Sequence, residues 1–272
     1  MSVAVEIAVA EEAGLVVAAH GGADRVELCV DLERGGITAP AELVAGCVRR
    51  ARSLVATQDA KPHFSVHALI RPHAGTGDFL DRPEEFLAPA DQVDRMAEQA
   101  RELVEAGADG IVIGALDADG ALDVPAIEAV RDAGLAAAAT ALRGLTLTLH
   151  RCVDALPDGT AREDAVRTAL RLGMHRVLTS GGAARAIDGA EDIARMVRAS
   201  EGLVDICAGG GVRPIDIRDL AGRTGLGDVH LSARRRGPQP GVETGPHPNP
   251  SDPDTPTDPA IVQAAVEAAG DQ

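Results

Sequence analysis

The sequence predicts a single-domain α/β fold, a closed (β/α)8 barrel of the TIM type. Three observations support this prediction: short runs rich in β-branched residues alternate with longer helical stretches, the alternation repeats eight times, and the chain has 272 residues. Strands that alternate with helices form a parallel sheet, and eight such units in about 250 residues are typical of a closed barrel. A doubly wound open sheet is the alternative, and the count of eight units favours the barrel.

The strands are expected in short runs dominated by Val, Ile and Leu, because such side chains pack well on a pleated sheet. The first run opens the sequence without a basic segment or a cleavage site, so it is interpreted as a strand and not as a signal peptide. The expected strands are Val3–Val9, Arg25–Cys29, Phe64–Ile70, Gly110–Ile113, Leu145–Leu149, Arg176–Leu178, Val204–Ala208 and Val229–Leu231.

The helices are expected between the strands, in longer segments rich in Ala, Leu, Arg and Glu, which are strong helix formers. Gly22, Gly107 and Gly173 lie where a helix is expected to end in the left-handed conformation. The expected helices are Glu11–His20, Ala41–Ala56, Ala90–Ala106, Pro125–Ala133, Arg162–Leu172, Ala190–Ala199, Ile215–Arg223 and Ala260–Ala269.

The segment before the last helix departs from the regular alternation. Residues 237–259 are rich in Pro and contain a single aliphatic side chain, that of Val242. We therefore predict a barrel over residues 1–236, an irregular linker over residues 237–259 and a helix that closes the barrel over residues 260–272. Because the linker leaves the face on which barrel active sites are built, both a flexible lid and disordered padding are open interpretations.

The charge composition excludes several classes of function. The 26 basic and 42 acidic side chains give a net charge of −16, and the chain has three Phe but no Tyr or Trp. Nucleic acid is not expected as a partner, because phosphate binding needs clustered basic residues and base stacking needs aromatic ones. Lys61 is the only lysine, and it precedes the third strand on the face opposite the expected site, which disfavours PLP and Schiff-base chemistry.

The cysteines and the hydropathy pattern predict a cytoplasmic protein. Cys29, Cys47, Cys152 and Cys207 are widely spaced and form no CxxC pair, so reduced thiols are expected. Apolar stretches such as Leu135–Leu142 are much shorter than the roughly 20 residues that a membrane span needs. We therefore expect no association with a membrane.

Side chains alternate along a strand, so the apolar set of each strand is expected to face the helices and the other set the barrel lumen. Val3, Val5, Ile7 and Val9 form one such apolar set, which leaves Glu6 in the lumen. The same parity on other strands gathers polar residues near the carboxyl ends, where barrel enzymes hold their active sites. The lumen set is Glu6, Arg25, Glu27, Cys29, His67, Arg71, His150, Cys207, His230 and Ser232.

Two glycine-containing loops predict an anion site at the same end of the barrel. Gly209, Gly210 and Gly211 follow the seventh strand, and Ser180 opens the loop after the sixth. Glycine lets backbone N–H groups approach an anion, and the loops after the last strands are a frequent phosphate site in barrels. The residues assigned to an anion are Arg25, Arg71, Arg151, Ser180, Gly209, Gly210, Gly211 and Ser232.

Each of these residues also has a structural interpretation that the sequence leaves open. Glu6 and Glu27 are alternatively ion-pair partners of a lumen arginine, and the glycine run is alternatively a tight turn. Buried cysteines and histidines are also common as small fillers and hydrogen-bonded core residues. His150 stands out because Arg151 and Asp154 follow it, which places a base, a cation and a carboxylate together.

The chain carries seven characteristic short blocks, in this order: Ala23–Cys29, Gly35–Thr38, Ile70–Pro72, Gly77–Phe79, His150–Arg151, Arg176–Gly181 and Ala208–Val212. Together they resemble the CutC family over roughly residues 3–233. The resemblance implies a TIM barrel, a cytoplasmic location, self-association into a homo-oligomer and a role in copper homeostasis and tolerance. It further implies copper binding through cysteine, as proposed for some members, and it implies no established reaction.

The chain departs from the family pattern at three places. Ala8 stands where members commonly carry a cysteine late in the first strand, and Cys152 and Val153 replace the Ala-Phe pair of a His-Arg-Ala-Phe-Asp block. His73 replaces the usual second arginine after the Arg-Pro pair. The missing thiol weakens a Cu(I) site, because Cu(I) prefers soft sulfur ligands.

Two functions from different classes remain as hypotheses. The first is a cytoplasmic protein of copper homeostasis that binds copper, and its candidate ligands are Cys29, Cys207, His67 and His230. The second is a barrel enzyme that acts on a small phosphorylated or carboxylated metabolite. Its acid–base candidates are Glu27, His150 and Asp154, beside the anion-binding residues named above.

Overall fold

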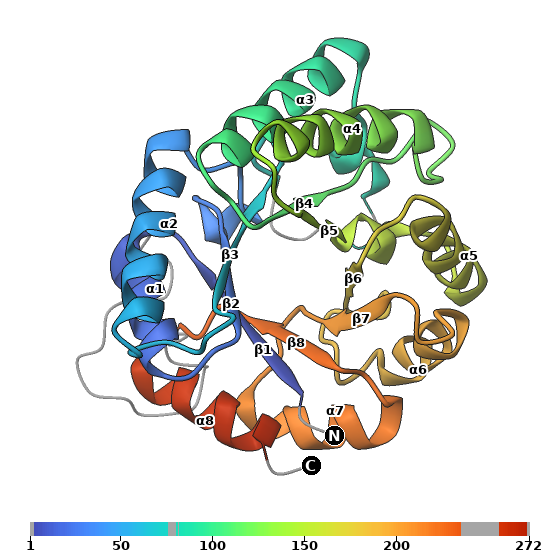
Figure 1. Cartoon of the computed structure of the whole chain (residues 1–272). Coiled ribbons are helices and arrows are strands. Elements are labelled where there is room, and N and C mark those ends of the chain that lie inside the picture. The colour runs from blue at the N-terminus through green and yellow to red at the C-terminus, as the bar shows by residue number, and fades with distance from the viewer. Residues whose placement is uncertain (1–2, 76–79, 81, 235–255, 271–272) are drawn as a thin grey trace.

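Eight parallel strands close into a barrel in the computed structural model, which describes residues 3–75, 80, 82–234 and 256–270. The strands follow one another around the ring in chain order, and β1 pairs with both β2 and β8 (Figure 1). The block Gly77–Phe79 and most of the expected linker lie outside the described residues. The closed ring of eight parallel strands confirms the predicted α/β barrel.

The strands begin and end within one residue of the predicted bounds. They are β1 Ala4–Val9, β2 Arg25–Leu28, β3 Ser65–Leu69, β4 Gly110–Ile113, β5 Thr146–Leu149, β6 Arg176–Thr179, β7 Asp205–Ala208 and β8 Asp228–Leu231. The match is close because the β-branched runs, which are buried on both faces of the sheet, differ clearly in composition from the helical segments of this sequence.

The helices form an outer ring around the barrel (Figure 1). They are α1 Glu12–His20, α2 Ala41–Ala56, α3 Ala90–Glu105, α4 Val124–Thr140, α5 Gly159–Arg171, α6 Ala190–Ala199, α7 Pro214–Thr224 and α8 Pro259–Gly270. Three short 3-10 helices lie in the loops: η1 Leu32–Arg34, η2 Pro83–Phe86 and η3 Arg151–Ala155. Among the described helices none is long and apolar enough to cross a membrane.

The predicted end of α4 at Ala133 is wrong, because the helix continues through Gly134 to Thr140. A Cβ atom on Gly134 would lie 2.7 Å from Cδ1 of Ile111 on β4. The glycine is therefore present to let the helix approach the strand closely, and it does not terminate the helix. At the other end of the chain α8 begins at Pro259, within the predicted linker.

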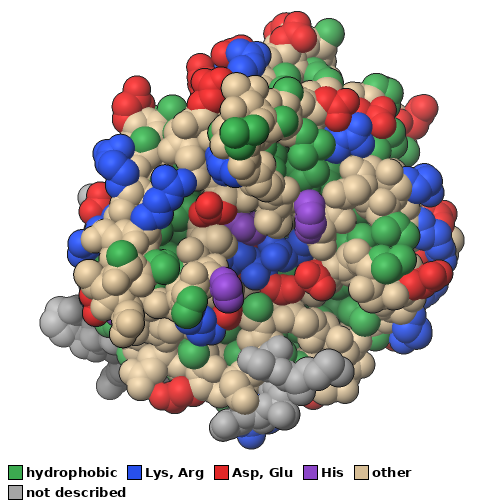
Figure 2. Space-filling view, viewed as in Figure 1, with side chains coloured by type: hydrophobic (Ala, Val, Ile, Leu, Met, Phe, Trp, Pro, Cys, Tyr) green, Lys and Arg blue, Asp and Glu red, His purple; other side chains and the backbone are tan. Residues whose placement is uncertain are grey.

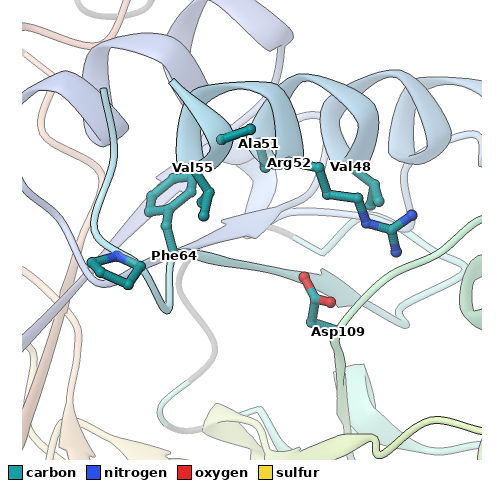
Figure 3. A pocket seen from close by; sticks show the side chains of 8 residues that line it. Val48, Ala51, Arg52, Val55, Phe64 and Asp109 are labelled. Carbon is teal, nitrogen blue, oxygen red and sulfur yellow. The ribbon is translucent and has the colours of Figure 1, made fainter. Parts of the chain in front are cut away.

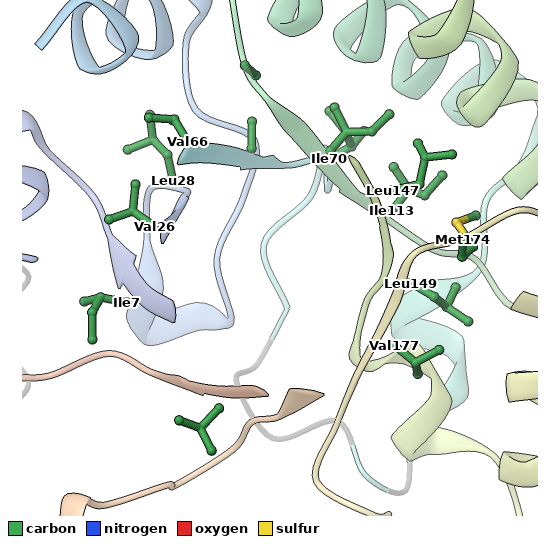
Figure 4. Close-up of a cluster of buried hydrophobic side chains, with 14 of the residues drawn as sticks. Ile7, Val26, Leu28, Val66, Ile70, Ile113, Leu147, Leu149, Met174 and Val177 are labelled. Carbon is green, nitrogen blue, oxygen red and sulfur yellow. The ribbon is translucent and has the colours of Figure 1, made fainter. Parts of the chain in front are cut away.

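Two separate hydrophobic clusters confirm the predicted parity of the strands. The large one lies between the barrel and the helices, and it holds outward-facing strand residues such as Ile7, Val26 and Leu149 (Figure 4). The small one contains Cys29, Leu69 and Val112. Since Leu69 and Val112 have the opposite parity to the outward set, this second cluster lies inside the barrel.

Lys61 lies at the amino ends of the strands, as expected. Its Nζ atom pairs with Oδ1 of Asp24 at 2.7 Å, and these two residues precede β3 and β2. The lysine side chain is 42% exposed. The opposite end of the barrel, at the carboxyl ends of the strands, is therefore without a lysine.

One glycine of the barrel wall is required by a side chain in the lumen. A Cβ atom on Gly110 of β4 would lie 2.8 Å from Cδ2 of His67, and Gly110 is paired with His67 in the register of β3 and β4. The imidazole therefore lies across the β4 backbone, where only a residue without a side chain leaves room.

We expect the substitution Gly110→Ala to lower the free energy of unfolding by roughly 1–3 kcal/mol, because the methyl group overpacks the lumen against His67. Thermal or urea unfolding followed by circular dichroism measures the change. Gly144→Ala is the control, since a Cβ atom there meets nothing within 4 Å. Equal stability of the two variants would contradict the close packing.

Candidate functional site

A network of buried charges fills the lumen and crosses the seam where the last strand meets the first. Arg25 of β2 donates from Nε to Oε2 of Glu6 on β1 at 2.7 Å, and it pairs through a second nitrogen with Asp228 of β8. Burial alone would raise the pKa of Glu6, but Arg25 and a hydrogen bond with His230 hold it well below its usual range. Glu6 is therefore ionised, with Oε2 engaged by Arg25 and Oε1 by His230.

Arg176 of β6 extends this network across the barrel. Its Nε atom lies 3.8 Å from Oδ1 of Asp228, and it donates to Oγ1 of Thr148 at 3.3 Å. His67 of β3 lies 3.5 Å from Arg176 and 3.8 Å from Glu6. Burial lowers the pKa of His67 to about 3, so this imidazole is neutral.

Glu27 of β2 has no ion-pair partner in the described part of the chain. Its side chain is buried, with the residue 5% exposed, and no hydrogen-bond partner is found for its Oε2 atom. Burial raises the pKa of Glu27 to about 7. One ligand atom each of Glu27, Glu6 and His230 lie within 4.8 Å of one another.

His230 of β8 lies between the two glutamates. Its Nδ1 atom is 2.7 Å from Oε1 of Glu6. Burial acts to lower the pKa of His230, but the charges of Glu27 and Glu6 outweigh it, and the pKa is raised above its ordinary value. The imidazole can therefore carry a proton or, when neutral, act as a ligand.

Asp154 of η3 holds together the loops that follow β5 and β6. Its Oδ1 atom accepts hydrogen bonds from the Thr179 hydroxyl at 2.6 Å and from the amides of Ser180 and Gly182. Its Oδ2 atom accepts from Nε of Arg151 at 2.8 Å. With both oxygens saturated, this carboxylate, expected as an acid–base group, has the geometry of a positioning residue.

Arg151 is the arginine that this arrangement presents at the mouth of the barrel. Its side chain is 23% exposed, and its second terminal nitrogen donates to the Ser180 hydroxyl at 3.0 Å. Gly210, with φ +98°, lies directly against it, since a Cβ atom there would be 2.7 Å from the guanidinium. Only glycine allows this contact.

The glycine run after β7 divides into two parts. The amide of Gly209 donates to the carbonyl of Thr179 at 2.8 Å, so Gly209 is part of the barrel wall. Within the described residues no hydrogen bond is found from the amide of Gly210 or Gly211, and both glycines are half-buried. Asp216, in the first turn of α7, already accepts hydrogen bonds from Arg213 and Arg185.

His150 lies deeper than its neighbour Arg151. Its Nδ1 atom accepts the amide hydrogen of Cys152 at 3.1 Å, and its ring lies 5.4 Å from that of Phe86, centroid to centroid. Burial, together with the charge of Arg71, lowers the pKa of His150 to about 3. His150 is therefore a neutral residue that caps η3.

The two other predicted anion-binding arginines are engaged by protein groups. Arg25 is the centre of the lumen network described above. Arg71 donates to the carbonyl of Gly35 at 3.0 Å and to Glu85 at 3.3 Å, and it lies over the ring of Phe86. Ser232 lies directly after β8 and is half-buried, and no hydrogen bond of its side chain is found among the described residues.

The two lumen cysteines are in different surroundings. Cys29 packs in the small apolar cluster, while Cys207 lies near the charges of Glu6 and Asp228. Burial raises the pKa of both thiols well above the ordinary value. Among the described residues no group of three close ligand atoms includes a thiol. The residues present therefore do not make a sulfur-based Cu(I) site of three ligands.

Arg176 and Asp228 were missing from the predicted lumen set, although they carry much of its charge. Arg176 directly precedes the outward-facing Val177, and Asp228 directly precedes the outward-facing Val229. Applying the alternation to β6, and one residue earlier on β8, would have placed both in the lumen. Charged, histidine and polar side chains are visible at the centre of the ring in Figure 2.

A groove of about 300 Å³ lies away from this site, between α2 and the amino ends of β3 and β4 (Figure 3). Its lining is mostly aliphatic, with Phe64 at one side and with Arg52 and Asp109 as its charged groups. The predicted site residues do not contribute to it. The candidate catalytic and ligand-binding side chains lie in the lumen and at its mouth instead.

We expect His150 to make the fold sensitive to acid. Its pKa is about 3 in the folded chain and about 6.5 in the unfolded chain. Below pH 6.5 the unfolded chain therefore binds a proton that the folded chain does not bind, and the free energy of unfolding falls as the pH drops. Between pH 7.5 and 5.5 this loss is about 1.4 kcal/mol. In His150→Asn the side-chain oxygen can also accept the Cys152 amide hydrogen, and the midpoint of urea unfolding should fall less over the same pH range. A pH dependence equal to that of the wild type would contradict a neutral imidazole at His150.

Comparisons with known proteins agree with the fold and with the family resemblance. The model of the CutC family matches residues 3–235. A CutC family protein of Agrobacterium fabrum is 37% identical over 227 residues, which cover 84% of this chain and 78% of the relative. One of Caulobacter vibrioides is 35% identical over 241 residues, covering 89% and 84%.

A solved structure from Streptococcus agalactiae, provisionally named as the copper homeostasis protein CutC, has the same fold. It superposes with a TM-score of 0.71 at 23% identity, and the match covers 85% of this chain and 98% of the other. With the family model spanning the whole barrel and curated relatives above 30% identity, the chain belongs to the CutC family.

Proposed function

We propose that this protein is an enzyme that binds a small phosphorylated or carboxylated metabolite at the carboxyl ends of β5 to β7. The observation that carries the proposal is that the Arg151 guanidinium lies against Gly210, while the amides of Gly210 and of its neighbour Gly211 have no hydrogen-bond partner in the described part of the chain. Cationic and N–H donors that converge at the mouth of a barrel are the groups that recognise an anion.

The mouth is preorganised for such a ligand. Asp154 fixes Arg151 through Nε and fixes the loop after β6 through the amides of Ser180 and Gly182. The ordering of these groups therefore takes place during folding, and a ligand does not bear its entropic cost on binding. A structural turn alone would not need a guanidinium held against glycine.

Proton transfer in this enzyme is assigned to Glu27. Of the three acid–base candidates, Asp154 has both oxygens engaged by donors and His150 is engaged at Nδ1 by a backbone amide. Glu27 keeps one carboxylate oxygen without a partner in the described part of the chain. A buried carboxylate of this kind at a barrel mouth is a candidate for chemistry, because a structural one would be paired.

We expect phosphorylated and carboxylated metabolites, or inorganic phosphate as a first probe, to raise the melting temperature of the wild-type protein. Arg151→Gln should abolish the shift, since it removes the charge that faces the anion. Arg167→Ala, on the exposed side of α5, is the control and should keep it. An equal shift in the wild type and in Arg151→Gln, or no shift with any anion, would refute the proposal.

Copper homeostasis in the cytoplasm is the second candidate function, in line with the name of the Streptococcus agalactiae relative. The specific observation in its favour is that Cys29 and Cys207 lie on lumen positions of the barrel as free thiols. Free cysteines suit a reducing compartment, and sulfur is the ligand that Cu(I) prefers. Self-association into a homo-oligomer belongs to the same family-based proposal, and gel filtration with light scattering tests it.

If copper is bound through these thiols, the reduced protein should take up one Cu(I) per chain against a competing chelator under anaerobic conditions. Cys29→Ser and Cys207→Ser should each weaken the uptake, because oxygen is a harder donor than sulfur. Cys47→Ser, on α2 outside the lumen, is the matched control. No uptake by the wild type would rule out this function.

A further inference from the structure

One carboxylate of the lumen network has no ion pair of its own. Glu6 and Asp228 are paired with Arg25, and Asp228 also faces Arg176. Glu27 adds a third carboxylate, which has no ion-pair partner among the described residues and lies beside His230. An unpaired buried charge is costly, so Glu27 needs a positive partner, and a proton, the protonated His230 or a bound cation can supply it.

Three side chains of types that commonly ligate metals meet around Glu27. Glu6, Glu27 and His230 come from β1, β2 and β8, which are neighbours in the barrel, and one ligand atom from each lies within 4.8 Å of the other two. Ligand atoms around a tetrahedral Zn²⁺ ion, each about 2.1 Å from the metal, lie about 3.4 Å from one another. Small side-chain movements therefore suffice to close the cluster around an ion.

An independent observation indicates that the cluster is incomplete as it stands. The Glu27 side chain is buried, yet its Oε2 atom has no hydrogen-bond donor in the described part of the chain. Buried carboxylate oxygens are otherwise satisfied in native proteins. A bound cation would satisfy this oxygen and neutralise the charge of Glu27 at once.

We infer that Glu6, Glu27 and His230 form a binding site for a divalent cation. Two carboxylates and one imidazole are oxygen and nitrogen donors, which suit Zn²⁺, Mn²⁺ and Cu²⁺ and do not suit Cu(I). In the absence of the ion, Glu6 and His230 contact each other at 2.7 Å, and the cation displaces the proton that they share. When the site is filled, Glu27 is held as a carboxylate and orients the ion.

When the cation is bound, Glu27 is its ligand in place of the proton transfer proposed for this residue above. The cation site uses other side chains than the anion site at Arg151, although the charge of Arg151 acts on both Glu27 and His230. It is also separate from the two lumen thiols, whose Sγ atoms join no three-ligand group in the described residues. Variants of Glu27, Arg151 and Cys29 therefore distinguish the three proposals.

The test is equilibrium dialysis of chelator-treated full-length protein against Zn²⁺, Mn²⁺ or Cu²⁺, with metal analysis and the melting temperature as the two measurements. We expect one equivalent of at least one of these ions and a higher melting temperature on binding. Glu27→Gln and His230→Gln should each weaken binding by at least about tenfold. Glu128→Gln on the exposed face of α4 and Cys29→Ser should bind as the wild type does.

Glu27→Gln is expected to fold, because it is isosteric and removes a buried charge whose Oε2 atom has no hydrogen-bond partner in the described structure. Circular dichroism checks the fold, and His230→Gln serves if Glu27→Gln is unfolded. The inference is overturned if the wild type takes up none of the three ions. It is equally overturned if folded Glu27→Gln or His230→Gln binds with wild-type affinity, or if only the thiol variant loses the ion.

Discussion

The ion pairs that Arg25 makes with Glu6 and Asp228 are the interaction on which the rest of the lumen depends. They join β2, β1 and β8, and so they cross the seam where the first and last strands meet. The desolvation cost of buried ions largely cancels their attraction, so the net stabilisation is small. Loss of one partner, however, leaves an uncompensated buried charge, so the pairs tie β2 to its neighbour β1 and to β8. Glu27 has no ion-pair partner among the described residues, and Arg25 and Arg176 are already engaged by other carboxylates.

The same network explains why the candidate site lies where it does. A barrel interior is ordinarily filled by layers of branched aliphatic side chains. Here an apolar cluster inside the barrel is formed by Cys29, Leu69 and Val112, near β2 to β4. Charged and histidine side chains from β1, β2, β3, β6 and β8 meet beside it. At the carboxyl ends of β5 and β6, Asp154 holds the loops together.

Much of the fold could be predicted from the sequence, because most strands combine an apolar outward set with a more polar inward set. The lumen position of Glu6, Glu27 and His230 followed from that alternation. The end of α4 could not be predicted in this way, since Gly134 is a typical stop signal and its reason, the closeness of Ile111, is a contact between distant segments. Tertiary packing outweighs local propensity at such a position.

The roles of individual site residues were less accessible to prediction than their positions. Asp154 and Arg71 carry the residue types that acid–base chemistry and anion binding need, yet their hydrogen bonds go to the protein itself. Saturation of an oxygen or a guanidinium depends on loops from different strands, and no sequence pattern encodes it. Glu27 differs from these two residues, because its Oε2 atom has no hydrogen-bond partner in the described part of the chain. Its proposed role follows from that lack of a partner.

The position of Lys61 has a practical consequence. It is the only lysine of the chain, its ammonium group is partly exposed, and it is bound to Asp24 at the amino ends of the strands. Apart from the α-amino group, reagents that acylate primary amines therefore have a single place to react. A chain tethered to a surface through Lys61 would be anchored at the amino ends of its strands, with the carboxyl ends and the candidate site turned toward the solution.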